Sequence, residues 1–266
     1  MNAPNSSFLA RAARNIIEYR RMKRLRNQAL SGPAQSYPAF VINLERSPER
    51  RQYITSHLRS IGIEPTIVPA YDGKKMSMAE LTADGRYNDE VSKQSFDRSL
   101  LLGEIGCTLS HFSIYQRMVR DNIPVALVVE DDSQFVPDAR QRIEALLKNA
   151  PADWSVIQLR YDCRNYEPTA VEGLVRFRSE GSLPVASTSY LINLAAARVM
   201  AANVLPVRYP ADSLLGRIRQ WGLQPYGAFP EPVGVNNVFP SAIQGNRNSR
   251  FRASNFVKNV LLRIFG

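Results

Sequence analysis

Residues 125–132, with the sequence VALVVEDD, constrain the fold more than any other stretch of this chain. Five apolar residues without polar alternation are typical of a strand that is buried on both faces, as in the sheets of α/β proteins. Side chains alternate along a strand, so Glu130 and Asp132 should project to one side and Asp131 to the other. Ligands of open α/β sheets gather at the carboxyl ends of strands, which is where this acidic triplet falls.

The acidic triplet predicts a metal site. Three adjacent carboxylates repel one another, and a bound cation relieves that repulsion. A hard ion such as Mg²⁺ or Mn²⁺ takes oxygen ligands, typically one or two carboxylates together with substrate phosphates. The alternative is a solvated acidic turn that ends a strand. The buried strand that precedes the triplet favours the metal site, with Glu130 and Asp132 as its ligands.

The positive charge of the chain is confined to its two ends. The net charge is +10, of which residues 1–30 carry +6 and residues 245–266 carry +5, so the residues between them carry −1. An enzyme that acts on nucleic acid more usually spreads its basic residues over the groove that holds the phosphates, so we expect no nucleic-acid partner. Cys107 and Cys163 fit neither a zinc motif nor a disulfide framework, and reduced, cytoplasmic thiols are expected.

Both basic ends are predicted to be amphipathic, at residues 8–26 and again at residues 256–265. Such segments suit an anionic membrane surface, and the alternative is a solvated helix that packs on the domain. No segment reaches the ~18 apolar residues that a membrane span requires. The N-terminus also lacks the features of a secretory signal. We therefore expect a cytoplasmic protein that binds peripherally to the inner face of the cell membrane.

A strand–helix–strand unit is predicted over residues 39–68. Its strands are residues 39–44 and 63–68, and the helix between them starts at Ser47-Pro48 and stops near Gly62. The unit lacks the glycine-rich dinucleotide fingerprint, which disfavours NAD or FAD. Asp72, in the turn that follows, is suited to accept hydrogen bonds from ribose hydroxyls, although an Asp-Gly pair is also a common plain turn.

The rest of the chain alternates between predicted helices and strands. We expect at most short helices over residues 74–99, then a helix to about Arg120, a helix over 137–148, a strand over 154–159, hairpin and loop material over 160–187, a strand over 189–194 followed by a helix to about 203, a helix from 211 to 221, and Pro-rich segments over 225–240. Glycines near the start of the helix that reaches Arg120 let a ligand approach its first amides. Ser110 and His111 lie in that helix, and a structural role is the alternative to ligand binding for both.

An ordered series of motifs resembles glycosyltransferase family 25, which includes lipopolysaccharide-type transferases and collagen galactosyltransferases. The motifs are FVINLER at 40–46 with ERR at 49–51, AYDG at 70–73, GEIGC at 103–107 with Ser110-His111, EDD at 130–132, and weaker matches at 189–192, 210–212 and 241–243. They cover about residues 38–245. We therefore expect a basic segment and linker over 1–37, a catalytic domain over 38–245 and a basic tail over 246–266.

The resemblance implies an α/β fold of the GT-A-like, Rossmann-type kind that binds nucleotide sugars on a mixed central sheet. It implies a divalent metal, Mn²⁺ or Mg²⁺, held by the acidic triplet as this family's version of a DXD motif. It further implies inverting transfer of a hexose, expected to be galactose from UDP-galactose. The implied acceptor is a lipopolysaccharide, a lipooligosaccharide or another surface glycan of a bacterium, in free or lipid-linked form.

The resemblance also implies roles for individual residues. Asp212 is the candidate catalytic base or a further group at the metal, with an N-cap as the alternative, and Glu104 and His111 are further catalytic candidates. The expected donor-binding residues are Asn43, Leu44, Arg46, Arg50, Asp72, Gly73, Gly103, Ser110 and Asp131.

Two other classes of function compete with this hypothesis. One is a non-catalytic protein that binds membranes or nucleic acid through its basic ends, and the near-neutral middle disfavours it. The other is a metal-dependent phosphohydrolase. That class would need a second His/Asp cluster, whereas this chain has only two histidines, His57 and His111.

Overall fold

The computed structural model describes residues 35–178, 181–183, 185–236 and 238–239. Contacts divide the chain after Asn236, and the fold is that of the unit up to this residue. The two basic amphipathic segments and the weak motif at 241–243 lie outside the described residues. The domain boundaries after residues 37 and 245 therefore stay predictions.

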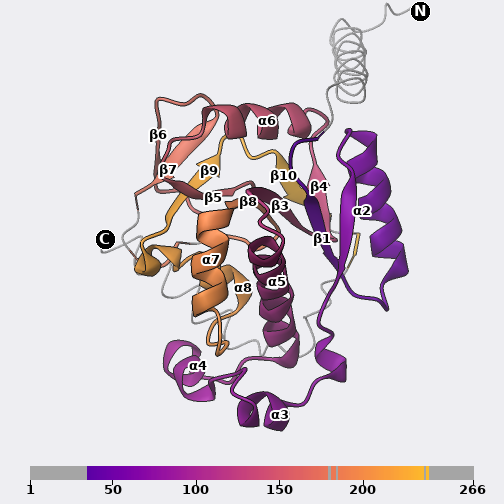
Figure 1. Ribbon diagram of the computed structural model, residues 1–266, viewed down its shortest axis with the longest axis vertical. Coiled ribbons are helices and arrows are strands. Elements are labelled where there is room, and N and C mark those ends of the chain that lie inside the picture. Colours follow the sequence, from indigo (N-terminus) through magenta and orange to yellow (C-terminus); the bar gives the residue numbers. More distant parts are fainter. Residues whose placement is uncertain (1–34, 179–180, 184, 237, 240–266) are drawn as a thin grey trace, which may run out of the picture. The chain divides into compact units, whose positions relative to one another are not determined.

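A mixed eight-stranded sheet forms the centre of this unit, in the order β2-β1-β3-β8-β5-β9-β7-β6 (Figure 1). The strands are β1 Ala39–Asn43, β2 Pro65–Pro69, β3 Val125–Glu130, β5 Trp154–Gln158, β6 Tyr166–Pro168, β7 Leu174–Phe177, β8 Ser189–Asn193 and β9 Gln224–Ala228. Strand β1 is parallel to both β2 and β3, whereas β8 is antiparallel to β3 and β5. The expected α/β class with a mixed central sheet is confirmed.

A second, two-stranded antiparallel sheet pairs β4 Ser133–Phe135 with β10 Val233–Val235. Only two residues, Asp131 and Asp132, separate the end of β3 from the start of β4. The chain therefore turns sharply at Asp131-Asp132, and the carboxylates of the triplet leave the sheet at this turn.

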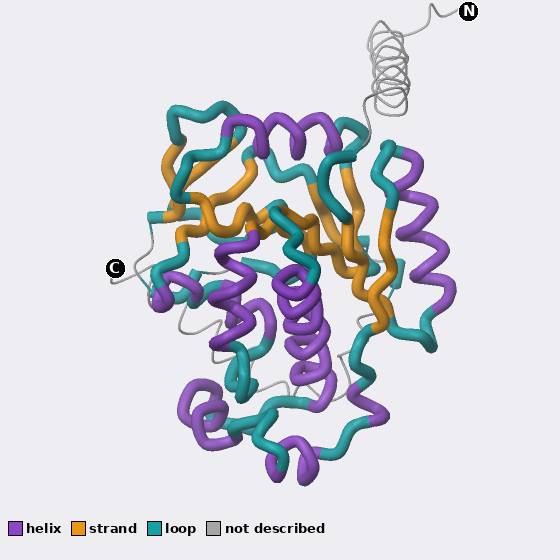
Figure 2. Tube along the Cα trace, in the orientation of Figure 1, coloured by secondary structure: helices purple, strands orange, loops and turns teal. Residues whose placement is uncertain are grey.

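Helices cover both faces of the central sheet, and Figure 2 shows α5 and α7 on one side of the strands and α6 on the other. The long helices are α2 Pro48–Ser60, α5 Leu102–Arg120, α6 Ala139–Asn149 and α7 Leu194–Asn203. Ala126 and Val128 of β3 belong to the core with α5 and α7, while Leu127 and Val129 belong to the core with α2 and α6. Because both faces are covered, β3 is apolar without alternation, as predicted.

Short helices account for the polar region and for the segment before β9. They are η1 Gly73–Lys75, α3 Met78–Ala83, α4 Asp89–Phe96, α8 Ala211–Leu215 and η2 Ile218–Trp221. The continuous helix predicted over 211–221 is wrong, because α8 ends at Gly216. There Leu183 donates its N–H to the Gly216 carbonyl at 2.8 Å, and a Cβ on Gly216 would lie 2.3 Å from the Leu183 oxygen.

Strand β9 was not predicted, because Pro225 argues against a strand in the middle of a sheet. The structure accommodates Pro225 beside β5, where the register shifts between Trp154 and Val156. The hydroxyl of Ser155, at this irregularity, accepts the N–H of Gln224 at 3.0 Å. The proline therefore occupies a bulged position in the ladder.

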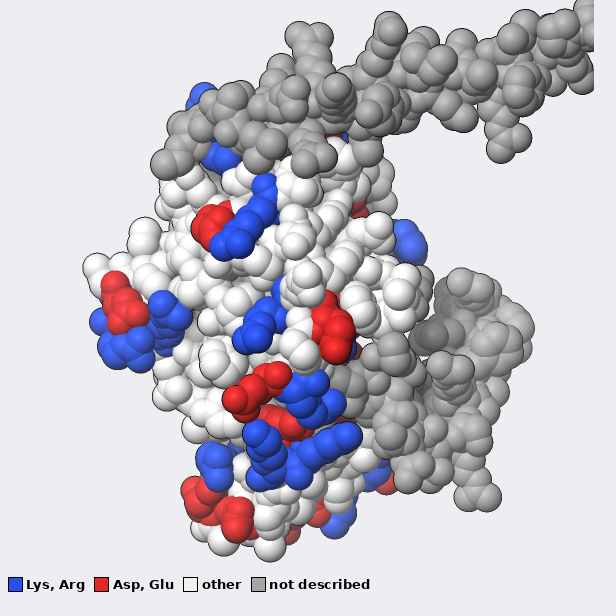
Figure 3. All heavy atoms as spheres, turned by 90° about the vertical axis from the view of Figure 1, so that its right-hand side faces the viewer, with Lys and Arg blue, Asp and Glu red and all other residues white. Residues whose placement is uncertain are grey.

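The lengths of the helices and the distribution of surface charge concern the expected membrane and nucleic-acid partners. Among the residues that the structure describes, no helix is both long enough and apolar enough to cross a bilayer. On the face shown in Figure 3, acidic and basic side chains are interspersed in small groups. This mixture agrees with the near-neutral charge of the chain between its two ends.

Two glycines let the loop after β2 press against the first turns of α5. A Cβ on Gly73 would lie 2.6 Å from the Gly103 nitrogen, and a Cβ on Gly106 would lie 2.5 Å from the Tyr71 oxygen. Tyr71 also donates its N–H to the Ser110 hydroxyl at 2.9 Å. The AYDG and GEIGC motifs thus form one backbone contact, which explains the glycines at positions 73 and 106.

We predict that Gly106→Ala destabilises the protein. Alanine in a helix gains up to about 1 kcal/mol over glycine. The clash with the Tyr71 carbonyl should cost more than this gain, with overpacking typically worth about 1–3 kcal/mol. Chemical denaturation of the wild type and the variant measures the difference in the free energy of unfolding. Gly181→Ala is the control, because a Cβ there meets nothing within 4 Å. A more stable Gly106→Ala variant would contradict the prediction.

Candidate functional site

The candidate site lies where the three parallel strands β1, β2 and β3 end side by side. Asn43 is the last residue of β1, Asp72 follows β2, and Glu130 is the last residue of β3. Helix α5 packs on the same face of the sheet as the Glu130 side chain and brings His111 beside it. This edge is where α/β sheets bind their ligands.

Asp131 is the buried member of the acidic triplet, with only 7% of its surface exposed. Asn43 donates its side-chain amide to Asp131 Oδ2 at 2.7 Å, and Arg50 Nη2 lies 2.7 Å from Asp131 Oδ1. Burial raises the pKa of Asp131, and the positive charge of Arg50 opposes that rise. A buried carboxylate is tolerable only when it is paired in this way. Asp131 therefore anchors the turn and does not face the open site.

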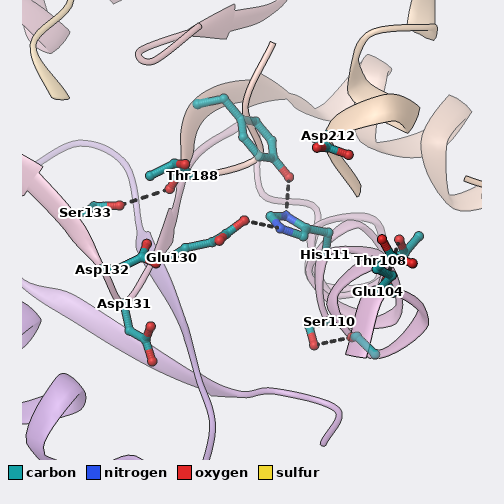
Figure 4. A network of polar contacts seen from close by, with 12 residues as sticks. Glu104, Thr108, Ser110, His111, Glu130, Asp131, Asp132, Ser133, Thr188 and Asp212 are labelled. Carbon is teal, nitrogen blue, oxygen red and sulfur yellow. Dashed lines mark hydrogen bonds and ion pairs between the residues drawn. The ribbon is translucent and has the colours of Figure 1, made fainter. Parts of the chain in front are cut away.

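Glu130 points to the opposite side, toward α5, as strand alternation predicts (Figure 4). Its Oε1 lies 3.4 Å from His111 Nε2, and its side chain is 24% exposed. Burial disfavours the charged carboxylate, but the hydrogen bond from His111 holds the pKa of Glu130 below its ordinary value. Glu130 is therefore an ionised carboxylate at the edge of solvent.

Asp132 lies beside Glu130 in Figure 4, and its side chain is 19% exposed. Arg50 Nη2 contacts Asp132 Oδ2 at 2.8 Å, so one guanidinium bridges Asp131 and Asp132. Burial and the charge of Glu130 raise the pKa of Asp132 to about 6. Two repelling carboxylates at a solvent edge fit a hard divalent cation, which would remove the repulsion and bind them as oxygen ligands. The residues present thus suit Mg²⁺ or Mn²⁺.

His111 is buried, with 1% of its surface exposed, and it connects the site to two buried tyrosines. Its Nδ1 lies 2.8 Å from the Tyr190 hydroxyl, which lies 2.7 Å from the Tyr115 hydroxyl. Neither tyrosine was predicted from the sequence as part of the site. Tyr190 lies in a predicted strand, but only the register of β8 against β3, which sets Tyr190 opposite Val128, reveals that it faces α5.

Asp212 lies in the first turn of α8 and is exposed. Thr108 of α5 fixes the segment that precedes α8 by donating its hydroxyl to the Tyr209 carbonyl at 3.1 Å. Burial and the charges of Glu130 and Asp212, in that order, raise the pKa of Cys107, so the Asp212 charge acts on the site. Pro210 occupies the N-cap position of α8, but Asp212 Oδ1 accepts the N–H of Ser213 at 2.6 Å, so Asp212 also satisfies an amide in the first turn and the structural alternative stays open.

Glu104 does not join the acidic cluster. Arg98 binds both of its carboxylate oxygens, with Nη1–Oε2 at 2.8 Å and Nη2–Oε1 at 2.7 Å. Glu104 Oε2 also accepts the N–H of Leu101 at 2.8 Å, which caps the start of α5. These contacts support a structural role for Glu104 and give no support to the catalytic role expected from the resemblance.

Ser110 also serves the fold. It is fully buried, and its hydroxyl donates to the Gly106 carbonyl at 2.7 Å while it accepts the N–H of Tyr71. The glycine positions 73 and 103 form the same backbone contact between the loop and α5. The structure thus gives Gly73, Gly103 and Ser110 a part in shaping this edge of the sheet, and direct donor contact by them stays a prediction.

The remaining donor-binding candidates lie at the rim of the site. Arg46 donates Nε–H to Asp72 Oδ2 at 2.8 Å, and Lys74 donates its N–H to Asp72 Oδ1 at 3.0 Å. Leu44 is half-buried, and its carbonyl accepts the N–H of Ser47 at 2.9 Å. These bonds order the loops after β1 and β2. A ribose contact by Asp72 stays a prediction.

The family model described as "Glycosyltransferase family 25 (LPS biosynthesis protein)" matches residues 36–215. A Drosophila melanogaster protein named "Glycosyltransferase 25 family member" is 34% identical over 181 residues, which cover 66% of this chain and 29% of that protein. A human protein named "Inactive glycosyltransferase 25 family member 3" is 33% identical over 186 residues, which cover 66% of this chain and 30% of that protein. The chain thus spans less than a third of the length of these relatives.

Solved structures resemble the chain only distantly. A glycosyltransferase involved in glycosylation of the major capsid of PBCV-1 gives a TM-score of 0.36 at 7% identity and covers 83% of this chain and 98% of its own. A putative glucose-1-phosphate thymidylyltransferase from Bacillus anthracis gives 0.39 at 11% identity and covers 81% and 99%. At this level the likeness carries no argument about function.

We predict that Asp132→Asn stabilises the protein when no metal is present. Between pH 3.8 and about 6, folded Asp132 keeps a proton that the unfolded chain has released, so its contribution to stability falls as the pH rises. A pKa difference of this size is worth about 3 kcal/mol at most. In EDTA at about pH 7.5 the variant should gain about 1–3 kcal/mol in free energy of unfolding, and the gain should vanish below about pH 4.

Thermal or chemical denaturation over a pH series measures this gain. The matched control is Asp84→Asn, because the hydrogen bond from Arg86 lowers the pKa of exposed Asp84 and its loss should bring no stabilisation. An Asp132→Asn variant that is less stable than the wild type at about pH 7.5, or whose gain does not change with pH, would refute the electrostatic reading.

Proposed function

This chain belongs to glycosyltransferase family 25, and from that premise we propose that it transfers a hexose from a nucleotide sugar to a glycan acceptor with the help of a divalent cation. The observation that carries the proposal is the pair Glu130–Asp132. Both carboxylates are partly exposed at the end of a buried strand. The charge of Glu130 helps to raise the pKa of Asp132, and the charges of both add to the effect of burial in raising the pKa of Cys107. Because some relatives are named inactive, turnover itself is the first quantity to measure.

In this proposal Glu130 and Asp132 hold Mn²⁺ or Mg²⁺. When bound, the cation neutralises charge on the departing diphosphate. Asn43 and Arg50 keep the turn that carries these ligands rigid through their bonds to Asp131. Beside the site, the hydrogen bond from Tyr71 to Ser110 holds the 70–73 loop against α5.

Asp212 is the proposed base. The acceptor hydroxyl attacks the anomeric carbon, the bond from that carbon to the nucleoside diphosphate breaks, and the hydroxyl proton passes to Asp212. A single displacement of this kind inverts the anomeric configuration, and a positioned carboxylate is well suited to take the proton. The exposure of Asp212 and the effect of its charge on Cys107 support this role.

The finer assignments rest on the family resemblance. We propose UDP-galactose as donor, and a bacterial lipopolysaccharide, lipooligosaccharide or other surface glycan as acceptor. Since the chain spans less than a third of the length of its curated relatives, their activities cannot be assigned to it from the matched segment alone.

We predict that UDP-galactose binds best in a panel of UDP-, GDP- and CMP-linked sugars, and that binding requires Mn²⁺ or Mg²⁺. Calorimetric titration with and without EDTA measures both properties, and product formation with a soluble glycan acceptor measures turnover. Asp132→Ala should lose metal-dependent binding while it stays folded, because the side chain lies at a strand end outside the core. Equal donor binding by the wild type with and without EDTA would exclude the metal site.

Asp212→Asn separates binding from chemistry. It should keep donor affinity within about twofold of the wild type and lower kcat by about 10²–10⁴, the usual range for the loss of a general base. Ser213→Ala is the matched control, because it alters the neighbouring position of α8 and leaves the carboxylate in place. Wild-type turnover in Asp212→Asn would rule out Asp212 as the base.

We further propose that the two basic ends hold the enzyme on the inner, anionic face of the cell membrane, near a lipid-linked acceptor. This follows from their charges of +6 and +5 and from their amphipathic sequences. Each basic residue near such a surface contributes up to ~1 kcal/mol, so several together anchor a domain reversibly.

Deleting residues 1–30 and 246–266 should therefore abolish co-sedimentation with anionic vesicles and leave transfer to a short soluble acceptor largely unchanged. Added salt should release the full-length protein, because screening shortens the range of the surface charge to about 8 Å at physiological ionic strength. Neutral vesicles are the control. Equal binding of the full-length and trimmed proteins to anionic vesicles would refute the membrane proposal.

A further inference from the structure

Cys107, His111 and Glu130 bring three kinds of ligand atom together beside the acidic pair. Cys107 and His111 are four residues apart on α5, so their side chains share one helix face. Glu130 reaches the same place from the end of β3. The cysteine sulfur, an imidazole nitrogen and a carboxylate oxygen all lie within 4.8 Å of one another.

The spacing of two of these atoms already matches a tetrahedral metal centre. Zinc binds nitrogen and oxygen at about 2.0–2.2 Å, which sets the two atoms about 3.4 Å apart on a tetrahedron. His111 Nε2 and Glu130 Oε1 are 3.4 Å apart. The hydrogen bond that joins these two atoms is long, and the same separation suits two ligands of one ion.

The orientation of the His111 ring also supports a metal site, because two tyrosines fix it. The Tyr190 hydroxyl lies 2.8 Å from Nδ1 and is itself fixed by Tyr115, so the ring is locked with Nε2 toward Glu130. Metal-ligating histidines almost always have their other ring nitrogen hydrogen-bonded in this manner. All three rings are buried, whereas Cys107 and Glu130 are partly exposed, so an ion can reach the site from solvent.

We propose that Cys107, His111 and Glu130 form a binding site for a thiophilic divalent cation of the Zn²⁺ class, with a fourth coordination position open to solvent. The mixed sulfur, nitrogen and oxygen set is one that Zn²⁺ favours and that Mg²⁺ and Mn²⁺ do not. This site has different ligands from the oxygen pair Glu130–Asp132, except that Glu130 belongs to both. Binding replaces the proton of the Cys107 thiol, which is released to water, and the proton of the neutral imidazole then resides on His111 Nδ1, which donates it in a hydrogen bond to the Tyr190 hydroxyl and leaves Nε2 for the ion. Cation binding at this site does not depend on sugar transfer.

Titration of EDTA-treated, full-length protein with Co²⁺ tests this site, because a cobalt–thiolate bond gives a charge-transfer absorption band that oxygen ligands do not. We expect one equivalent of Co²⁺ to produce the band and Zn²⁺ to remove it. Cys107→Ser should abolish the band, and Cys163→Ser, the matched control at the other cysteine, should keep it. Asp132→Ala should also keep it, which distinguishes this site from the oxygen pair.

Tyr190→Phe tests the holding of His111. It should keep the thiolate band and weaken Co²⁺ binding by about 10- to 100-fold, as loss of a partner behind a ligating histidine does. Circular dichroism verifies that each variant is folded. Absence of a thiolate band in the folded wild type, or its persistence in Cys107→Ser, would overturn the proposal.

Discussion

The buried carboxylate of Asp131 is the constraint on which the rest of the site depends. An unpaired charge in this position would cost several kcal/mol, so the protein must supply partners from elsewhere in the chain. Asn43 at the end of β1 and Arg50 in the first turns of α2 do so, at 2.7 Å each. Their bonds tie three segments that are far apart in sequence. The strand end, the helix start and the sharp turn after β3 are thereby held as one rigid corner.

Alternation along β3 then decides which carboxylates remain for chemistry. Its core residues face α2 and α6 or α5 and α7 in turn, so Asp131 continues one row and Glu130 the other. Glu130 meets His111 on the α5 side, whereas Asp132, which follows the end of the strand, lies beside Glu130 at the edge of solvent and contacts the same Arg50 nitrogen as Asp131. Glu130 therefore has Asp132 as an oxygen neighbour on one side and Cys107 and His111 as sulfur and nitrogen neighbours on the other. In our proposals, a hard cation binds Glu130 with Asp132, and a thiophilic cation binds Glu130 with Cys107 and His111.

The sequence predicted the parallel unit well, because its signals are local. Unbroken apolar runs mark β1 and β3, and Ser47-Pro48 marks the start of α2. The acidic triplet after β3 was likewise predicted from its place at the end of a buried strand. The features that were not predicted depend on contacts between segments that are distant in sequence.

Two candidate site residues illustrate this limit. Glu104 looks catalytic in its motif until Arg98 is seen to bind both of its oxygens, and Ser110 looks like a ligand until Tyr71 is seen to donate to it.

The residues at the end of β3 that stabilise the fold are not the ones proposed for catalysis, and this separation matters for how such a protein can evolve. The groups that hold the corner, Asn43, Arg50 and Asp131, are different from the exposed pair that would act on a substrate. Substitution of this partly exposed pair removes their mutual repulsion together with the contacts to His111 and Arg50, and it leaves the bonds of Asn43 and Arg50 to Asp131 in place. A lineage can therefore shed the chemistry and inherit the scaffold intact.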